Sequence, residues 1–517
     1  MPQADHYDLI IIGAGVSGLG AACHLQAACP TKRFVILEGR DAIGGTWDLF
    51  RFPGIRSDSD LYTYGYDFKP WHGQPIATAP EIMSYLDEVV TEHDIERHIR
   101  FNHWVTDASW STADACWTVR ADTAEGEATL TANFLFMCQG YYSYEKGYRP
   151  EFPNEDAFDG TIVHPQEWPA DLDYGGKHMV VIGSGATAAT IVPAVAEDVA
   201  SVTQLQRSPT YYISLDNSVE DDMIQELRAL DVPKEWIHGI KKRKILEFGR
   251  VMTERALGEP EAVARELIGM AAAALPEGYD VETHFTPRYG PWRERLCLLP
   301  DGDLFEAIRS GKASVATDQI RRFVADGIEL ASGDVLPADV IVVATGIELC
   351  GLGDIAFDVD GAAISIPDTF TYKGVMISDL PNLAWIFGYI RSSWTLRSDL
   401  IAHYVCRLLK HMDATGVRQC TPRLRPGDRG MNAKAFIDPD DFAPGYIRRG
   451  APRLPKQGDA EPWTNCQDYY AERETLADAS FDDGVLVFDN PAEEDRAASR
   501  RRTAGPVKPP LRRRRPC

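Results

Sequence analysis

Short apolar runs that end at a glycine occur twice along the chain and organise its hydrophobic pattern. The first lies at residues 10–12, in DLIIIGAGVSGLGAACHLQ, and the second at residues 179–182, in HMVVIGSGATAATIVPAVA. A helical pattern follows each run, and another apolar run follows each helical pattern. Short runs rich in β-branched residues are typical of buried strands in parallel sheets. The pattern therefore predicts an α/β protein with two strand–turn–helix–strand units.

The first glycine motif has the spacing that a bound dinucleotide requires. Gly13 permits a tight turn, Gly15 lets the backbone approach a pyrophosphate, and Gly18 lets the helix pack on the strand. Free N–H groups at the start of the helix face the phosphates, and Ser17 can add a hydroxyl donor. The next predicted strand ends at Glu38, 20 residues after Gly18, where an acid accepts hydrogen bonds from a ribose.

The second glycine motif differs from the first in the residue that ends its next strand. This strand, SVTQLQRSPT, ends in Arg207 instead of an acid, and a guanidinium suits a 2′-phosphate. The motif therefore predicts NADPH, whereas the first predicts FAD, and one chain holding both predicts a flavin reduced by the nicotinamide. The residues expected to bind NADP in this motif are Gly183, Ser184, Gly185, Ala186, Thr187, Ala188, Arg207 and Ser208.

Length and pattern together predict two dinucleotide-binding (Rossmann-like) domains. At 517 residues the chain is long enough for roughly two to four domains. We expect an FAD domain in two parts, residues 1–145 and 376–490, around an NADPH domain at 146–375. The latter carries a predicted helical insertion at about 211–315. Near the return to the first domain, a helix is predicted to start at Trp394 and to face the flavin with that end.

Composition narrows the possible partners and locations. The net charge of −24 argues against nucleic acid as the main partner. The sequence has no apolar run long enough for a membrane span and no signal peptide before the first strand, so we expect a cytoplasmic protein. Residues 491–517 are rich in arginine and proline and predict a disordered basic tail.

Cysteine spacing argues against two kinds of chemistry. The ten cysteines are scattered, and no two form a CxxC motif. Disulfide reductases need a close redox-active pair beside the flavin, and zinc sites need paired ligands. We therefore expect neither a disulfide reductase nor a metal site, and electron delivery to oxygen or another acceptor remains.

The segment FDGTIVHPQEWP, 14 residues before the second glycine motif, carries a family resemblance. Its pattern of Phe158, Gly160, His164, Trp168 and Pro169 resembles the fingerprint of Baeyer–Villiger monooxygenases, the class B flavoprotein monooxygenases. The motifs RSDSD, GSGATA, QRSPTY and PDGDLF are similar to the ethionamide-activating branch of that family. The resemblance covers approximately residues 5–490.

The resemblance also implies roles for individual residues. Arg295, in RYGPWRERLCLLPDG, matches the active-site arginine, and Asp58 matches the aspartate that pairs with it. A lysine precedes that arginine in the cyclic- and aryl-ketone branch, whereas this chain has Glu294. Further residues that the resemblance implies are Gly45, Thr46, Trp47, Asp58 and Val105 for FAD, and Arg56 and Ser57 for NADP.

Family membership implies FAD, NADPH as reductant and insertion of one oxygen atom from O₂. The expected substrates are ketones, which give esters or lactones, and thioethers, which give sulfoxides. Two alternatives stay open: a flavin-containing monooxygenase that oxidises only nitrogen or sulfur, and a non-catalytic flavin-binding redox protein. The oligomeric state, monomer or homodimer, is left open by the sequence.

Overall fold

The first of two main sheets is mixed, and its parallel centre contains the first apolar run. The computed structural model describes residues 5–219, 221–294 and 296–491. Strand β1 (Asp5–Ile12) pairs in parallel with β2 (Phe34–Leu37) on one side and with β6 (Gly126–Met137) on the other. The remaining strands of this sheet are β3 (Ile99–Arg100), β4 (Trp104–Ser111), β5 (Cys116–Thr123), β17 (Ala356–Val359), β18 (Ala362–Ile364), β19 (Thr371–Tyr372), β20 (Met376–Ile377) and β21 (Leu383–Trp385).

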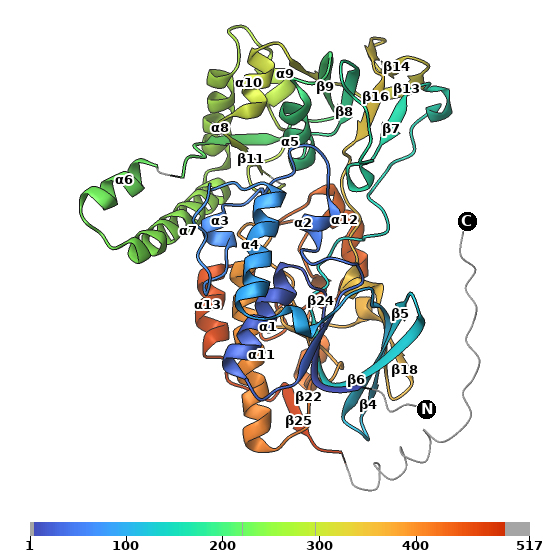
Figure 1. Ribbon diagram of the computed structural model, residues 1–517, viewed down its shortest axis with the longest axis vertical. Coiled ribbons are helices and arrows are strands. Elements are labelled where there is room, and N and C mark those ends of the chain that lie inside the picture. The colour runs from blue at the N-terminus through green and yellow to red at the C-terminus, as the bar shows by residue number, and fades with distance from the viewer. Residues whose placement is uncertain (1–4, 220, 295, 492–517) are drawn as a thin grey trace.

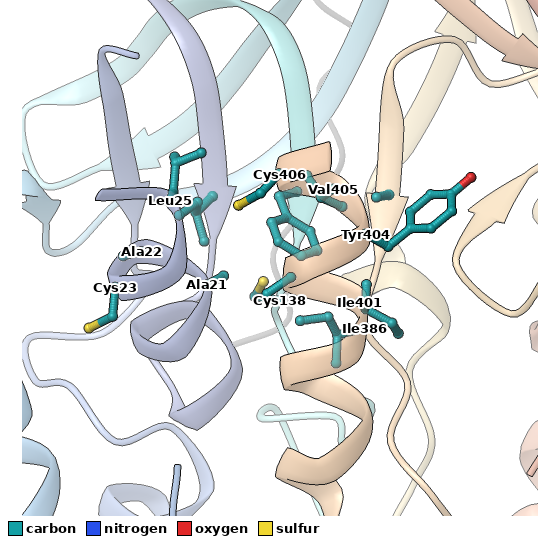
Figure 2. Close-up of a cluster of buried hydrophobic side chains, with 14 of the residues drawn as sticks. Ala21, Ala22, Cys23, Leu25, Cys138, Ile386, Ile401, Tyr404, Val405 and Cys406 are labelled. Carbon is teal, nitrogen blue, oxygen red and sulfur yellow. The ribbon is translucent and has the colours of Figure 1, made fainter. Parts of the chain in front are cut away.

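Helices α1 (Val16–Ala28) and α11 (Trp394–Thr415) pack side by side although they are far apart in the sequence (Figure 1). Figure 2 shows Ala21 and Leu25 on the side of α1 toward α11, and Cys406 of α11 pointing toward them. These side chains are buried, and they form one hydrophobic core with Leu9 and Ile11 of β1. Burial of this shared apolar surface holds the two parts of the first domain together.

The second main sheet contains the second apolar run. Its strand order is β12 (Ala313–Thr317), β9 (Ser201–Gln206), β8 (His178–Ile182), β16 (Val340–Val343) and β7 (Thr161–Val163). All four pairings are parallel. Helix α5 (Ala186–Val195) follows β8 as α1 follows β1, and α10 (Asp303–Arg309) packs against α5. The two units therefore repeat the same local topology, and the predicted fold class is confirmed.

A helical region lies between two strands of the second domain. It contains α6 (Asp222–Ala229), α7 (Lys234–Gly258), α8 (Pro260–Ala274) and α9 (Val281–Phe285), between the paired strands β10 (Tyr211–Leu215) and β11 (Leu296–Pro300). Helix α6 and the adjoining end of α7 project from the body of the molecule (Figure 1). Helix α7 also contacts the one-turn helix α3 (Leu61–Tyr64), which belongs to the first domain.

The chain returns to the first sheet earlier than residue 376, where the second part of the FAD domain was predicted to begin. Strand β17 pairs in parallel with β4, and β18 pairs with β17. Both strands are short and have few buried positions, so their pattern carries little sign of the sheet they join. In the described ranges no helix is long and apolar enough to cross a membrane. The predicted tail falls almost wholly on residues 492–517, which lie outside the described residues.

Candidate active site

A cavity of about 550 Å³ lies against the carboxyl ends of β1 and β2. This volume is in the range of ligand and cofactor sites, roughly 300–1,000 Å³. Parallel sheets form their binding crevices at this edge. The predicted FAD residues that line the cavity are Gly13, Gly15, Ser17, Glu38, Gly45, Thr46, Trp47, Asp58 and Val105.

Three glycines give the first turn its shape. Gly13 has a φ of 101°, and a Cβ there would lie 2.8 Å from the carbonyl oxygen of Cys138 at the end of β6. A Cβ on Gly18 would overlap the carbonyl oxygen of Gly13, so Gly18 lets α1 pack on β1 and does not line the cavity. Gly15 faces Gly45, at 3.7 Å between an added Cβ and the Gly45 Cα. The turn therefore presents bare backbone to the cavity.

Glu38 is buried where β2 ends. Its Oε2 accepts a hydrogen bond from the Ala14 N–H at 2.7 Å, and its Oε1 accepts one from the Arg40 N–H at 2.9 Å. Burial raises the pKa of Glu38, and these hydrogen bonds partly offset the effect. The carboxylate thus connects the glycine turn to the end of the neighbouring strand. This is the position of the acid that binds a ribose in such folds.

Aromatic side chains form much of the cavity wall. Tyr141 and Trp394 are stacked, with ring centroids 5.0 Å apart, and the Trp394 Nε1–H donates to Ser17 Oγ at 2.7 Å. The Trp47 Nε1–H donates to Tyr64 Oη at 2.9 Å, and burial raises the pKa of Tyr64. Both indole rings are therefore fixed by hydrogen bonds at their polar edges.

Gln139 gives an independent sign that the larger cavity receives a polar ligand. The residue lines the cavity directly after β6, and both polar atoms of its side-chain amide are buried. Neither atom has a hydrogen-bond partner among the described residues. Buried amides are normally paired, so a ligand with donors and acceptors fits this wall better than an apolar one.

A smaller cavity of about 160 Å³ adjoins the larger one between the two domains. Thr46, Trp47, Asp58 and Tyr142 line both cavities. Four of the residues predicted to bind NADP line the smaller cavity: Arg56, Ser57, Ala186 and Thr187. His164 of the fingerprint segment lines it too. The first glycine turn and the start of α5 thus border adjoining cavities, although Gly183, Ser184 and Gly185 of the second turn line neither of the two.

Arg56 connects the loop of the first domain to two helices of the second. Its guanidinium forms an ion pair with Asp303 at the start of α10, in which Nη2 lies 3.3 Å from Oδ1. The same Nη2 donates to the carbonyl oxygen of Ala189 in α5 at 3.5 Å. Ser57 is buried, and its Oγ accepts a hydrogen bond from the Ala77 N–H at 3.3 Å. The loop is therefore fixed on both sides of the domain boundary.

The second glycine turn is built like the first but is more open. Gly183 has a φ of 143°, and a Cβ there would overlap the carbonyl oxygen of Ala344 after β16. A Cβ on Gly185 would meet nothing within 4 Å. Arg207 and Ser208 are exposed after β9, and the Ser184 Oγ donates to the Ser208 carbonyl oxygen at 3.0 Å.

Glu294 lies close enough to Arg207 for their charges to interact. Burial raises the pKa of Glu294, whereas the charges of Arg448 and then Arg207 lower it. Arg448 belongs to α12 (Gly445–Gly450), in the second part of the first domain. A phosphate bound to Arg207 would therefore also interact with the carboxylate of Glu294.

The fingerprint segment is divided between the cavity and the core of the second domain. His164 lines the smaller cavity, and its Nδ1 accepts a hydrogen bond from the Gln166 N–H at 3.2 Å. Burial lowers the pKa of His164, so the ring is neutral near pH 7. Phe158 packs on Phe323, and Trp168 meets Tyr174 edge to face, with 6.2 Å between ring centroids. Neither aromatic residue of the segment lines these two cavities.

The other fingerprint residues are Gly160 and Pro169, and the predicted catalytic pair is Asp58 and Arg295. A Cβ on Gly160 would overlap the carbonyl oxygen of Asp339, so this glycine allows two segments to pass closely. Pro169 is exposed. Asp58 is an exposed residue that borders both cavities. Arg295 lies outside the described residues, and its pairing with Asp58 stays a prediction.

Several cavity residues were not predicted from the sequence. They are Gln139, Tyr141, Tyr142 and Tyr144, which come after β6, and Tyr389 before α11. Their position directly after a buried strand was a usable signal, because residues at the carboxyl ends of parallel strands share one edge. No group of His, Cys, Asp or Glu side chains suited to a metal ion occurs in the described part of the chain.

Comparison with known proteins identifies the family. A family model described as pyridine nucleotide-disulphide oxidoreductase matches residues 10–248. The chain is 46% identical over 488 residues to the FAD-containing monooxygenase EthA of Mycolicibacterium smegmatis, covering 94% of this chain and 98% of the relative. It is 45% identical over 487 residues to the probable FAD-binding monooxygenase AlmA of Acinetobacter baylyi, covering 94% and 96%.

Solved structures agree with these relatives at the level of the fold. An oxidised steroid monooxygenase bound to NADP matches with a TM-score of 0.74 at 22% identity, and the match covers 94% of this chain and 100% of that one. Cyclohexanone monooxygenase from Rhodococcus sp. Phi1 bound to NADP⁺ matches with a TM-score of 0.73 at 21% identity, with the same coverage. The predicted resemblance is confirmed, and the chain belongs to the family of FAD-containing monooxygenases that includes EthA.

Proposed function

We propose that this chain is an FAD- and NADPH-dependent Baeyer–Villiger monooxygenase that converts ketones into esters or lactones and thioethers into sulfoxides. The observation that carries the proposal is the connection of the two cavities at Thr46, Trp47, Asp58 and Tyr142. The larger cavity is lined by the first glycine turn and the smaller one by Ala186 and Thr187, directly after the second turn, so a flavin and a nicotinamide would meet at this junction. The relatives named above, which are FAD-containing or FAD-binding monooxygenases, support the flavin.

The larger cavity fits FAD by its shape and by its polar groups. The bare backbone from Gly13 to Gly15 would receive the pyrophosphate, and Glu38 would accept hydrogen bonds from the ribose. Gln139 would gain the partners that its buried amide lacks within the described residues. Bound there, FAD supplies hydride acceptance and the reduction of O₂, which side chains cannot perform.

The second turn would hold NADPH more loosely. Gly185 and Thr187 would lie under its pyrophosphate at the start of α5, and Arg207 would bind the 2′-phosphate. The nicotinamide end would then point into the smaller cavity. The neutral His164 there can orient a polar group without adding charge.

Arg295 and Asp58 would act in oxygen transfer. Oxygen insertion into a ketone passes through negatively charged oxygen, which a fixed cation in a dry site stabilises. The guanidinium of Arg295 would supply this charge, and the carboxylate of Asp58, at the junction of the cavities, would orient it. Trp47 and Tyr142 would exclude water from the same junction.

The direct test is a screen of ketones and thioethers with the purified, flavin-loaded protein. NADPH oxidation and oxygenated products would be followed together, the latter by mass spectrometry. Esters or lactones from at least one ketone support the proposal. Products from amines or thioethers alone would instead favour a nitrogen- or sulfur-oxidising enzyme, and flavin without any oxygenated product would contradict both.

A variant pair tests the assigned cation. Arg295→Ala should still allow flavin reduction by NADPH but should lose ester formation, by about 100-fold or more, because only oxygen transfer needs the charge. Arg293→Ala is the matched control, since the half-exposed Arg293 donates to the carbonyl oxygen of Asp440 and lies outside the two cavities. Ester formation at the parent rate in Arg295→Ala would show that the active site is wrongly assigned.

A further inference from the structure

Lys241 is a buried cation in the helical insertion, outside the two cavities. It lies on α7, and its side chain is only 3% exposed. Its Nζ lies 3.1 Å from Oδ2 of Asp221, the residue that caps α6, and 4.0 Å from the ring centroid of Tyr62 on α3. A buried ammonium is costly unless other groups compensate its charge. Here the compensation comes from the insertion and from the first domain together.

Asp60, two residues before Tyr62, is a second group of the first domain whose charge interacts with that of Lys241. Its Oδ1 accepts the Tyr62 N–H at 2.7 Å and so caps the one-turn helix α3. Burial raises the pKa of Asp60 to about 6, and the charge of Lys241 partly offsets that rise. The ammonium and the carboxylate therefore stabilise each other across the contact between α7 and α3.

Helix α3 connects this contact to the larger cavity. Its last residue, Tyr64, lines the cavity and accepts the hydrogen bond from Trp47. Thr63 Oγ1 lies 2.6 Å from Ser393 Oγ, and Thr395 Oγ1 donates to the Tyr64 carbonyl oxygen at 2.5 Å. The start of α11 is thus bound to the same turn. Asp58 and Ser59, which also line the cavity, come directly before its cap.

We propose that Lys241 is a positioning residue for the active site, which acts through Asp60 and α3 to hold Asp58 and Tyr64 in the arrangement that oxygen transfer needs. The proposal rests on the proposed function, because it assigns a role within the same site. Lys241 touches neither cavity, so its effect is indirect. The contact between α7 of the helical insertion and α3 then controls the rate of product formation.

The first test compares three lysine variants in the flavin-loaded enzyme. Lys241→Met keeps the length of the side chain and removes its charge, Lys241→Arg keeps the charge, and Lys244→Met removes an exposed charge three residues further on. We expect Lys241→Met to lower kcat for oxygenated product about 10-fold, with flavin content and the KM for NADPH near parent values. Lys241→Arg should recover most of the rate, and Lys244→Met should match the parent.

The outcomes separate positioning from general stability. An unchanged kcat in Lys241→Met, or an equal loss in Lys244→Met, would overturn the proposal. Loss of flavin in proportion to activity would also overturn it, because Lys241 would then only support the fold. If Lys241→Met does not fold, Asp60→Asn gives a second test from the other side, since Asn caps helices as well as Asp does.

The pH profile supplies the readout for Asp60→Asn. The groups around Asp60 are Lys241, Asp221 and Tyr62, while His238 beside Tyr62 has its pKa lowered to about 4 by burial and stays neutral. In the parent, kcat should fall as pH drops through about 6, because protonation of Asp60 removes its attraction for Lys241. Asp60→Asn should have the lowered rate already at pH 8 and lack this step. A parent-like rate and step in that variant would overturn the proposal.

The proposal can fail independently of the proposed function. Visible circular dichroism of the bound flavin reports the position of Tyr64 and Trp47 whether or not a product forms. We expect Lys241→Met and Asp60→Asn to change this spectrum in the same way and Lys244→Met to leave it unchanged. A parent enzyme that oxygenates no substrate would contradict the proposed function, whereas an unchanged spectrum in both variants would contradict the role of Lys241.

Discussion

The two glycine turns have the same backbone design but different surroundings. In each, a glycine with positive φ passes against a carbonyl oxygen at the end of a neighbouring strand, Cys138 for the first turn and Ala344 for the second. The first turn opens into a cavity of about 550 Å³ walled by residues from several distant parts of the chain, between residues 12 and 394. The second adjoins a cavity of about 160 Å³ and ends at exposed residues.

This difference indicates different lifetimes for the two dinucleotides. A cofactor surrounded by packed side chains can leave only when those chains move, and so it stays through many catalytic cycles. A cofactor bound at an open turn by an exposed arginine can exchange in every cycle. On the proposed assignment, the same motif would serve a resident cofactor in one domain and a co-substrate in the other, and the surroundings of each turn would cause the difference.

The largest expected effect comes from the glycines at the carbonyl contacts. Gly13→Ala and Gly183→Ala should each destabilise the fold, because the positive φ costs about 1–3 kcal/mol and the added Cβ meets backbone that cannot move freely. Gly185→Ala is the control, with open space around its Cβ. Thermal unfolding and soluble yield would measure the effect. A Gly183→Ala protein as stable as Gly185→Ala would show that the second turn is not built like the first.

The next effect concerns the buried acid of the first site. Glu38→Gln can accept only one of the two backbone hydrogen bonds that Glu38 now accepts, and its amide NH₂ then faces the other N–H. These two facing donors, each without an acceptor, should destabilise the folded protein by about 1–3 kcal/mol and lower the flavin content of the purified protein. Asp41→Asn, at an exposed position on the next loop, is the control. Full flavin occupancy in Glu38→Gln would remove Glu38 from the site.

A smaller effect is expected at the second site. Arg207→Ala should raise the KM for NADPH about 10-fold through loss of a charge-assisted contact, and leave the KM for NADH nearly unchanged. Because Arg207 is exposed, the unfolding temperature should not change. Steady-state kinetics with both cofactors would measure this. Equal losses with NADPH and NADH would mean that Arg207 does not meet the 2′-phosphate.

The smallest effect should come from Glu294, whose carboxylate interacts electrostatically with Arg448 and Arg207. Glu294→Gln removes repulsion of a 2′-phosphate and should lower the KM for NADPH about 2- to 5-fold, since half-exposed charges are strongly screened. The gain should shrink at high salt, where screening is greater. A gain that is equal for NADH, or that persists at high salt, would separate Glu294 from the phosphate site.

Much of the fold and part of the site could be predicted because they follow from local rules. Gly13, Gly15 and Glu38 obey a spacing that one strand, one turn and one helix impose by themselves. The helix that begins at Trp394 was visible in its apolar face for the same reason. Strands β17 and β18 could not be assigned to the first sheet, because four or fewer residues with mixed burial contain too little pattern.

The sequence by itself determined the two glycine-turn segments, at which we propose that dinucleotides bind, and the family that the chain resembles, because glycine spacing and a charged residue at a strand end act over short stretches of chain. Tertiary structure decided that Tyr141 stacks on Trp394, that Arg56 pairs with Asp303, and that Lys241 lies buried beside Tyr62. Such contacts join residues that are 179 to 253 positions apart. They depend on how the domains and the helical insertion pack, which no local pattern records.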